Sequence, residues 1–80
     1  MRIDVRYFAE LCERAGSDQQ WVSVTESTNA ASLYARLQDE HGFRFPTQAM
    51  RVAVNGRLCD WSQTLCDGDE VSFLPPFSGG

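Results

Sequence analysis

The sequence predicts a single α+β domain in which one mixed sheet packs against a main helix. Eighty residues suffice for one domain, and a composition of 42% hydrophobic and 22% charged residues is typical of a globular protein. Segments in which apolar and polar residues alternate, as in strands, are separated by two segments with helical spacing. The first and last of these segments are both strands, with an extra short helix after the first strand.

The first strand is expected at residues 2–7, where apolar and polar residues alternate without a break. Helical spacing then takes over at residues 8–15, and Gly16 stands where a helix commonly ends in a left-handed residue. Glu10 and Arg14 are expected to pair across one turn on the solvent side of this short helix. The apolar stripe that we place in the core consists of Phe8, Leu11, Cys12 and Ala15.

The second strand is expected at residues 20–25, and the main helix at about residues 29–41. Thr28 is the expected N-cap, because its hydroxyl can accept a hydrogen bond from a free amide of the first turn. Gly42 follows the last apolar position and is a stop signal. The stripe that faces the sheet consists of Ala30, Leu33, Tyr34 and Leu37.

Residues 43–50 are expected to form a loop that has room for one helical turn. Two short strands then follow at residues 51–54 and 57–59. They are joined by Asn55-Gly56, which is the strongest hairpin signal in the chain because both residues accept a positive φ.

The final strand is expected at residues 70–74, after a turn at Asp67-Gly68-Asp69. Pro75-Pro76 ends it, because proline cannot donate to a sheet ladder. If the first and last strands lie at the centre of the sheet, the fold is a β-grasp, the ubiquitin-like roll. The domain is then expected to cover residues 1–74, followed by an extended tail at residues 75–80.

The charge pattern excludes several classes of function. Eleven acidic and seven basic residues give a net charge of −4, and the basic residues are scattered singly. Nucleic-acid binding requires clustered cations, so a nucleic-acid partner is not expected. All seven basic residues are arginine, which rules out Schiff-base chemistry, a phosphate-binding lysine and isopeptide formation on a side chain of this sequence.

The sequence also contains no signal for a membrane or a metal. No apolar run approaches the ~20 residues of a membrane helix, and residues 1–7 do not have the pattern of a signal peptide, so we expect a cytoplasmic protein. The three cysteines and the one histidine lack the spacing of a zinc site. A Cys–His nucleophile pair is conceivable, but we favour buried cysteines and a histidine at a helix end. These residues are Cys12, Cys59, Cys66 and His41.

The last six residues do not look like part of a core. Two prolines favour an extended segment, and two glycines give a thin end without side chains. Six extended residues span roughly 20 Å. Taken alone, the Gly-Gly end favours a frayed terminus or a cloning scar over a functional element.

Three motifs together resemble the small subunit of molybdopterin synthase. The run from Asp67 to Gly80, DGDEVSFLPPFSGG, resembles the carboxyl end of that family, with its turn, strand, double proline and terminal Gly-Gly. Residues 6–11, RYFAEL, followed by Gly16, resemble its opening strand and helix, and residues 52–56, VAVNG, its middle strand and turn. The resemblance spans nearly the whole chain and implies the β-grasp fold.

The resemblance implies a sulfur carrier that works as one subunit of a heterotetrameric sulfurtransferase. A ubiquitin-activating-like adenylyltransferase would use ATP to adenylate the Gly80 carboxylate in trans, and a sulfur donor protein would allow its conversion to a thiocarboxylate. The sulfur then passes to the cyclic pyranopterin precursor to form the molybdopterin dithiolene. Catalytic side chains would lie on the large subunit. The chain alone would then be non-catalytic and would bind no cofactor or metal.

Within this scheme the tail residues have separate roles. Gly79 has no Cβ, which lets the end thread narrow channels in two enzymes. Leu74 is expected to point outward beside Phe77, because Val71 and Phe73 face the core. The segment expected to dock the partner consists of Leu74, Pro75, Pro76, Phe77 and Ser78.

Two alternatives remain beside this interpretation. The chain is also compatible with a sulfur carrier for another acceptor, such as thiamin thiazole, although such carriers usually lack a helix like that of residues 8–15. From a different class, a ubiquitin-like protein modifier or a plain interaction module would share the roll. A modifier would end as an amide on a target lysine, whereas a carrier would end as a thioacid.

Overall fold

The computed structural model describes residues 1–76, and its five strands form one mixed sheet in the order β2-β1-β5-β3-β4. The strands are β1 (Arg2–Tyr7), β2 (Gln19–Ser23), β3 (Arg51–Val54), β4 (Arg57–Cys59) and β5 (Glu70–Leu74). The helices are α1 (Ala9–Ala15), α2 (Ala30–His41) and a short 3-10 helix, η1 (Thr47–Ala49). The predicted α+β class and the order of the elements are confirmed.

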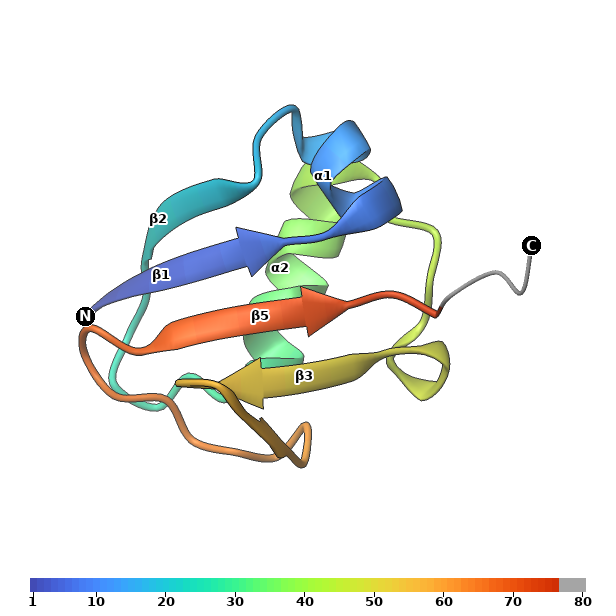
Figure 1. The fold of residues 1–80 in the computed structure, drawn as a ribbon. Helices are drawn as coiled ribbons and strands as arrows, with labels where there is room; N and C mark the ends of the chain where they lie inside the picture. Colours follow the sequence, from blue (N-terminus) through green and yellow to red (C-terminus); the bar gives the residue numbers. More distant parts are fainter. Residues whose placement is uncertain (77–80) are drawn as a thin grey trace.

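The first and last strands lie side by side in the centre of the sheet, as the β-grasp prediction required. β1 and β5 run parallel, with Val5 opposite Val71 and Tyr7 opposite Phe73. β2 pairs antiparallel with the other side of β1, and β3 pairs antiparallel with the other side of β5. Figure 1 shows α2 crossing one face of this sheet, with the amino terminus at the end of the sheet opposite to the end where β5 stops.

The core lies between the sheet and α2. Alternate side chains of each central strand point toward the helix, and all are almost fully buried, in keeping with the alternation seen in the sequence. Tyr34 of α2 contacts the rings of Phe43 and Phe73, with centroid distances of 6.0 and 5.2 Å. The largest fully buried side chains include Ile3, Val5, Tyr7, Leu33, Leu37, Val71 and Phe73.

The other face of the central strands carries polar side chains. Asp4 of β1 accepts hydrogen bonds from Arg6 at 3.0 Å and from Gln19 of β2 at 2.8 Å. The hydrogen bond from Arg6 holds the pKa of Asp4 below its ordinary value, and the bond from Gln19 acts in the same direction. The polar face is therefore built around a satisfied ion pair.

The N-cap of α2 is Asn29, and the prediction of Thr28 was wrong. The Asn29 Oδ1 accepts from the Ser32 amide at 2.8 Å, and the Asn29 amide donates to the Ser32 hydroxyl at 3.1 Å. Thr28 instead belongs to the preceding turn, where its amide donates to the Thr25 carbonyl. The reciprocal pair with Ser32 decides which of two adjacent capping residues begins the helix.

Local interactions also explain where β2 begins and where the two helices end. β2 begins at Gln19, one residue earlier than predicted, because the Ser17 hydroxyl bonds both the amide and the carbonyl of Gln19 and ends the turn there. The two predicted helix stops are confirmed, since Gly16 and Gly42 have φ of 80° and 74°. Within residues 1–76, no helix has the length and apolar character that crossing a membrane requires.

Candidate functional site

The tail leaves the domain directly from a central strand. β5 ends at Leu74, and Pro75 and Pro76 continue beyond the sheet at the end opposite the amino terminus (Figure 1). Proline has a fixed φ, so both residues favour a direction of exit that continues the strand. The predicted site residues Phe77, Ser78, Gly79 and Gly80 lie outside the described residues, and their roles stay predictions.

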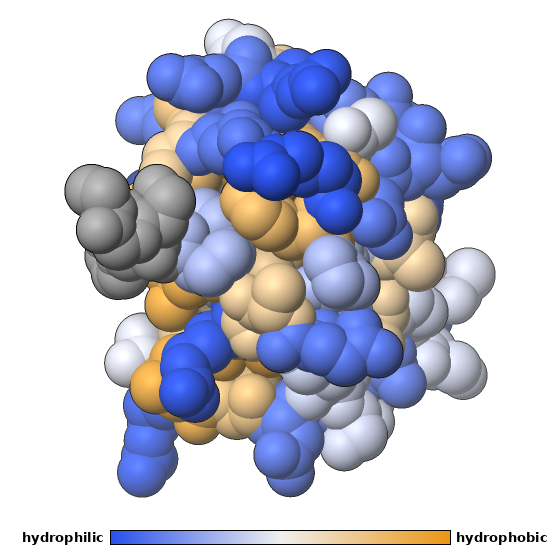
Figure 2. Space-filling model, turned by 90° about the vertical axis from the view of Figure 1, so that its right-hand side faces the viewer, coloured by the Kyte–Doolittle hydropathy of each residue, from blue (hydrophilic) through white to orange (hydrophobic). Residues whose placement is uncertain are grey.

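An apolar hollow of about 340 Å³ lies at this base of the tail. Its walls belong to the segment from the end of β1 to the start of α1 and to the end of β5 with the two prolines after it, and the parallel pairing of β1 with β5 brings these segments together. Figure 2 shows this end of the molecule, where hydrophobic surface lies exposed among hydrophilic residues. We call the residues that line the hollow the tail base: Phe8, Ala9, Leu74, Pro75 and Pro76.

Leu74 takes the outward position that the sequence predicts. Val71 and Phe73 of the same strand are fully buried, whereas Leu74 is half-buried and lines the apolar hollow. Its cross-strand neighbour on β3 is Arg51, which is exposed. Leu74 therefore presents apolar surface beside the tail, as a docking residue would.

The assignment of Phe8 to the core was wrong, because 46% of its side chain is exposed. Phe8 precedes α1 and has an extended backbone, with φ −129° and ψ 151°. Ala9 then adopts a positive φ of 50°, and the Leu11 amide donates to the Phe8 carbonyl at 3.0 Å. This turn breaks the helical spacing between Phe8 and Leu11, so only Leu11 enters the core.

The backbone of Ala9 is strained. A left-handed conformation costs an L-residue with a Cβ about 1–2 kcal/mol, and glycine or asparagine usually occupies such positions. Ala9 lines the apolar hollow at the base of the tail. Strained backbone conformations of this kind persist where the surrounding structure enforces them, and they cluster at functional sites.

A second, smaller hollow of about 160 Å³ also borders Pro75 and Pro76. The Arg44 Nε donates to the Glu10 Oε2 at 2.7 Å, and its guanidinium lies 4.5 Å from the centre of the Phe45 ring. The hydrogen bond lowers the pKa of Glu10 and raises that of Arg44. The predicted pair of Glu10 with Arg14 was wrong, because helical spacing carries no information about the loop that contains Arg44.

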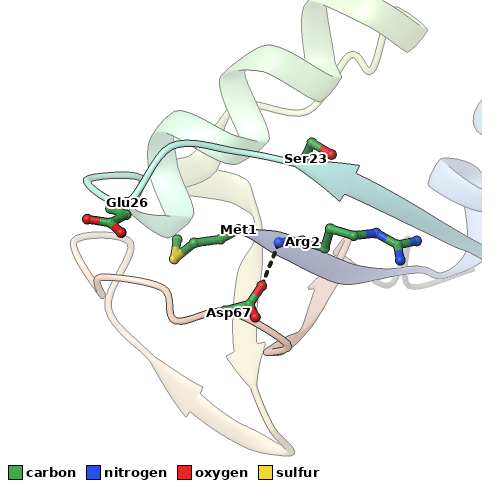
Figure 3. A pocket seen from close by; sticks show the side chains of 5 residues that line it. All are labelled: Met1, Arg2, Ser23, Glu26 and Asp67. Carbon is green, nitrogen blue, oxygen red and sulfur yellow. Dashed lines mark hydrogen bonds between the residues drawn. The ribbon is translucent and has the colours of Figure 1, made fainter.

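A larger polar hollow, about 480 Å³, lies at the opposite end of the molecule (Figure 3). Met1, Arg2, Ser23, Glu26 and Asp67 line it, and the Arg2 amide donates to the Asp67 Oδ1 at 2.8 Å. It surrounds the start of β1, whereas the tail leaves from the far end of β5. Size alone would favour this hollow, but its position separates it from the tail, and we assign the site to the tail base.

The cysteines and the histidine form no nucleophilic pair within residues 1–76. Cys12 and Cys59 are half-buried against the core, and burial raises the pKa of Cys59, whereas Cys66 is exposed, contrary to prediction. His41 ends α2 as predicted, and its Nε2 lies 3.0 Å from the Gln20 Oε1. Across the same part of the chain, no group of three or more histidine, cysteine or acidic residues is placed to hold a metal ion.

Comparison with known proteins gives matches over the full length of the chain. The model of the ThiS family matches residues 5–80. A molybdopterin synthase sulfur carrier subunit of Mycobacterium tuberculosis is 32% identical, with 100% of this chain and 99% of the relative covered. The protein of the same name from Escherichia coli is 34% identical, with 98% and 99% covered.

Solved structures show the same fold. SAMP1 from Haloferax volcanii is 27% identical with a TM-score of 0.84, and both chains are fully covered. A chain in the complex of subunits 1 and 2 of the molybdopterin-converting factor from Helicobacter pylori is 28% identical with a TM-score of 0.69, again with full coverage. A ubiquitin from Caldiarchaeum subterraneum, 16% identical with a TM-score of 0.68, covers 100% of this chain and 98% of its own. The fold is thus a ubiquitin-like β-grasp.

Proposed function

The chain belongs to the ThiS family, and from this premise we propose that it is the sulfur carrier subunit of a molybdopterin synthase. The relatives of that name align with it from end to end. The observation that carries the proposal is the apolar tail base, from which a tail ending in Gly79-Gly80 starts at a central strand. Such a tail has a fixed origin and a docking surface beside it.

The chemistry of the proposal takes place at the Gly80 carboxylate. A carboxylate resists substitution until one oxygen becomes part of a leaving group. Attack of the carboxylate on ATP in an adenylyltransferase would release pyrophosphate and form an acyl adenylate. A sulfide equivalent from a donor protein would then displace AMP and leave a thiocarboxylate, which is a stronger nucleophile than the carboxylate.

In this chemistry the chain itself would only present the Gly80 carboxylate to the enzymes that act on it. It has no lysine to hold the phosphates of ATP, so we assign ATP binding to the activating enzyme. Pro75 and Pro76 reduce the entropy lost when the tail is held extended in a channel. Gly79 and Gly80 keep the end narrow.

The large subunit of the synthase is the proposed partner at the tail base. The Helicobacter structure is a complex of two subunits of a molybdopterin-converting factor, which supports such a partner. The proposed contact surface consists of Phe8, Leu74, Pro75 and Pro76 of the tail base together with Phe77 and Ser78, and Phe8 contributes an exposed aromatic ring. Aromatic side chains at the centre of an interface often contribute most of its binding free energy. The proposal assumes a cytoplasmic protein.

A protein modifier is the second candidate, and one observation favours it. SAMP1 of Haloferax volcanii, a small archaeal modifier protein, matches this fold with a TM-score of 0.84, above the 0.69 of the chain from the molybdopterin-converting factor complex. A modifier would transfer its carboxyl end to an amine and finish as an amide. The two candidates therefore differ in the mass and the chemistry of the end of the chain.

The proposed function is tested by moving the terminal carboxylate. Deleting Gly80 places the carboxylate roughly 3.5 Å short of its normal position, and adding one alanine places it about as far beyond. A displacement of ~1 Å can cost on the order of a hundredfold in rate. Both variants should fold, bind the large subunit and lose sulfur transfer to the pterin precursor.

The assay is single-turnover product formation, with chemically thiocarboxylated wild type as the positive control. Intact-mass analysis of the wild type after activation should show the mass change of oxygen replaced by sulfur. Full transfer by either folded variant would refute the proposal. Amide conjugates in place of the thiocarboxylate would favour the modifier.

A further inference from the structure

Ala9 occupies a backbone conformation that its side chain disfavours. Within residues 1–76, only Ala9 and Asn55 combine a side chain with a positive φ, at 50° and 52°. Asn55 lies in the Asn55-Gly56 hairpin turn, where asparagine is a preferred residue. Alanine has no such preference. The positive φ at Ala9 therefore needs a reason outside the turn itself.

The surroundings of Ala9 supply that reason. Ala9, Pro75 and Pro76 line both hollows at the end of the sheet, so these three residues are shared by the two hollows. Phe8 lines the larger, apolar hollow, and the Glu10–Arg44 ion pair lines the smaller one. The left-handed turn thus stands at the point where the tail begins.

We propose that Ala9 is a positioning residue: its left-handed backbone turns Phe8 out of the core and holds it in the lining of the apolar hollow. With a negative, helical φ at Ala9, α1 would begin earlier and Phe8 would fall on the stripe of Leu11, where the sequence pattern puts it. The Phe8 ring would then leave the apolar hollow. The inference rests on the proposed function, because it names what shapes the surface for the large subunit.

Three substitutions distinguish the effect of the backbone conformation at position 9 from the effect of its side chain. Ala9→Gly keeps the positive φ without strain and removes the methyl group. Ala9→Val makes the positive φ much less favourable, because its branched Cβ is crowded there. Asn55→Val is the matched control, since it puts the same residue at the other left-handed position, at the end of the sheet away from the tail. It also removes the side-chain hydrogen bonds of Asn55 to Asp69 and Glu70.

Binding to the large subunit is measured by titration of each folded variant. We expect Ala9→Gly to bind within about threefold of the wild type, and Ala9→Val to bind at least about tenfold more weakly, as Phe8→Ala should. Asn55→Val should lower Tm but leave the Kd unchanged. Equal Kd values for Ala9→Val and the wild type would overturn the inference. So would equal losses in Ala9→Gly and Ala9→Val, or a tenfold loss in Asn55→Val.

A second readout needs no partner and separates this inference from the proposed function. A soluble paramagnetic agent should broaden the NMR signals of the Phe8 ring in the wild type and in Ala9→Gly, and broaden them much less in Ala9→Val. If the wild type fails to bind any large subunit but the ring behaves as expected, the proposed function fails and the role of Ala9 stands. A Phe8 ring that stays exposed in Ala9→Val refutes that role.

A chemical variant covers the case in which Ala9→Val does not fold. Ligation at Cys12 allows D-alanine to be placed at position 9, where a positive φ is its preferred conformation. Relief of the strain should raise Tm by about 4–8 °C and leave the Kd for the large subunit within about threefold. A lower Tm with D-alanine would show that the left-handed backbone is not what position 9 requires.

Discussion

Leu74→Asp is the most direct test of the docking surface. Leu74 is the last residue of β5 and lines the apolar hollow with Phe8 and the two prolines. An aspartate at this position would place a carboxylate in that hollow. The substitution should therefore separate the stability of the domain from its affinity for a partner.

The cost to the domain should be small. Full burial of a leucine side chain contributes about 1.5–3 kcal/mol, and Leu74 is only half-buried, so its loss should cost about 1 kcal/mol. Arg51 lies directly opposite on β3, and an opposite charge at that position recovers about 0.2–1 kcal/mol. The free energy of unfolding should therefore fall by no more than about 1 kcal/mol.

The cost to binding should be larger. The few residues that dominate an interface each contribute about 2 kcal/mol or more, and an unpaired carboxylate buried against apolar surface adds a desolvation penalty. A loss of about 2 kcal/mol weakens binding by about 30-fold. The ratio between the two costs is the signature of a docking residue rather than a core residue.

Isothermal titration of the folded variant against the large subunit measures this loss, and urea unfolding measures stability. Leu74→Asn, which resembles the aspartate in shape but has no charge, should bind with intermediate affinity. Trp21→Ser removes a side chain that is 49% exposed on edge strand β2 and should leave the Kd unchanged. A Kd for Leu74→Asp within threefold of the wild type would show that the tail base does not contact the partner.

Two further predictions concern side chains away from the tail. Replacing the three cysteines with alanine should cost about 1–2 kcal/mol of stability and preserve single-turnover sulfur transfer, since the proposed carrier group is the carboxyl end; a folded triple variant without transfer would implicate a thiol. Tyr34→Phe should cost only about 1 kcal/mol at pH 7, because Gln38 still donates to the Phe45 carbonyl at 3.2 Å after the 2.7 Å bond from Tyr34 is lost. Burial raises the pKa of Tyr34 to about 12, above its value of about 10 when unfolded, so its contribution to stability is complete below pH 10 and falls between pH 10 and 12. Urea unfolding at pH 7–12 should show a shallower loss in the variant, and an equal slope would contradict this account.

The sheet could be predicted from the sequence because its signals are local. Alternation marks β1 and β5, and the Asn55-Gly56 turn fixes the hairpin of β3 and β4. The central placement of β1 and β5 followed from the β-grasp hypothesis and is confirmed. The N-cap of α2 could not be chosen locally, because Thr28 and Asn29 are both good caps and the bond to Ser32 decides between them.

The tail base was only partly predictable. The alternation of β5 predicts that Leu74 points outward. The inability of proline to extend a sheet ladder predicts that Pro75 and Pro76 lie beyond the strand. The outward position of Phe8 could not be predicted, because position 8 also fits the apolar stripe of a helix. Only the positive φ of Ala9 shows that the helix starts after Phe8. Arg44 reaches Glu10 from a loop 34 residues away, so no spacing rule connects them.

The placement of β5 also bears on how the proposed carrier exchanges partners. β5 is hydrogen-bonded to β1 on one side and to β3 on the other, so the origin of the tail is fixed by two ladders. From that origin, six extended residues reach roughly 20 Å. An activating enzyme and a large subunit would each have to hold the same end, and one tail of that length cannot thread two channels at once. In the proposed function the two partners must therefore compete for the carrier, and added large subunit should inhibit its adenylation.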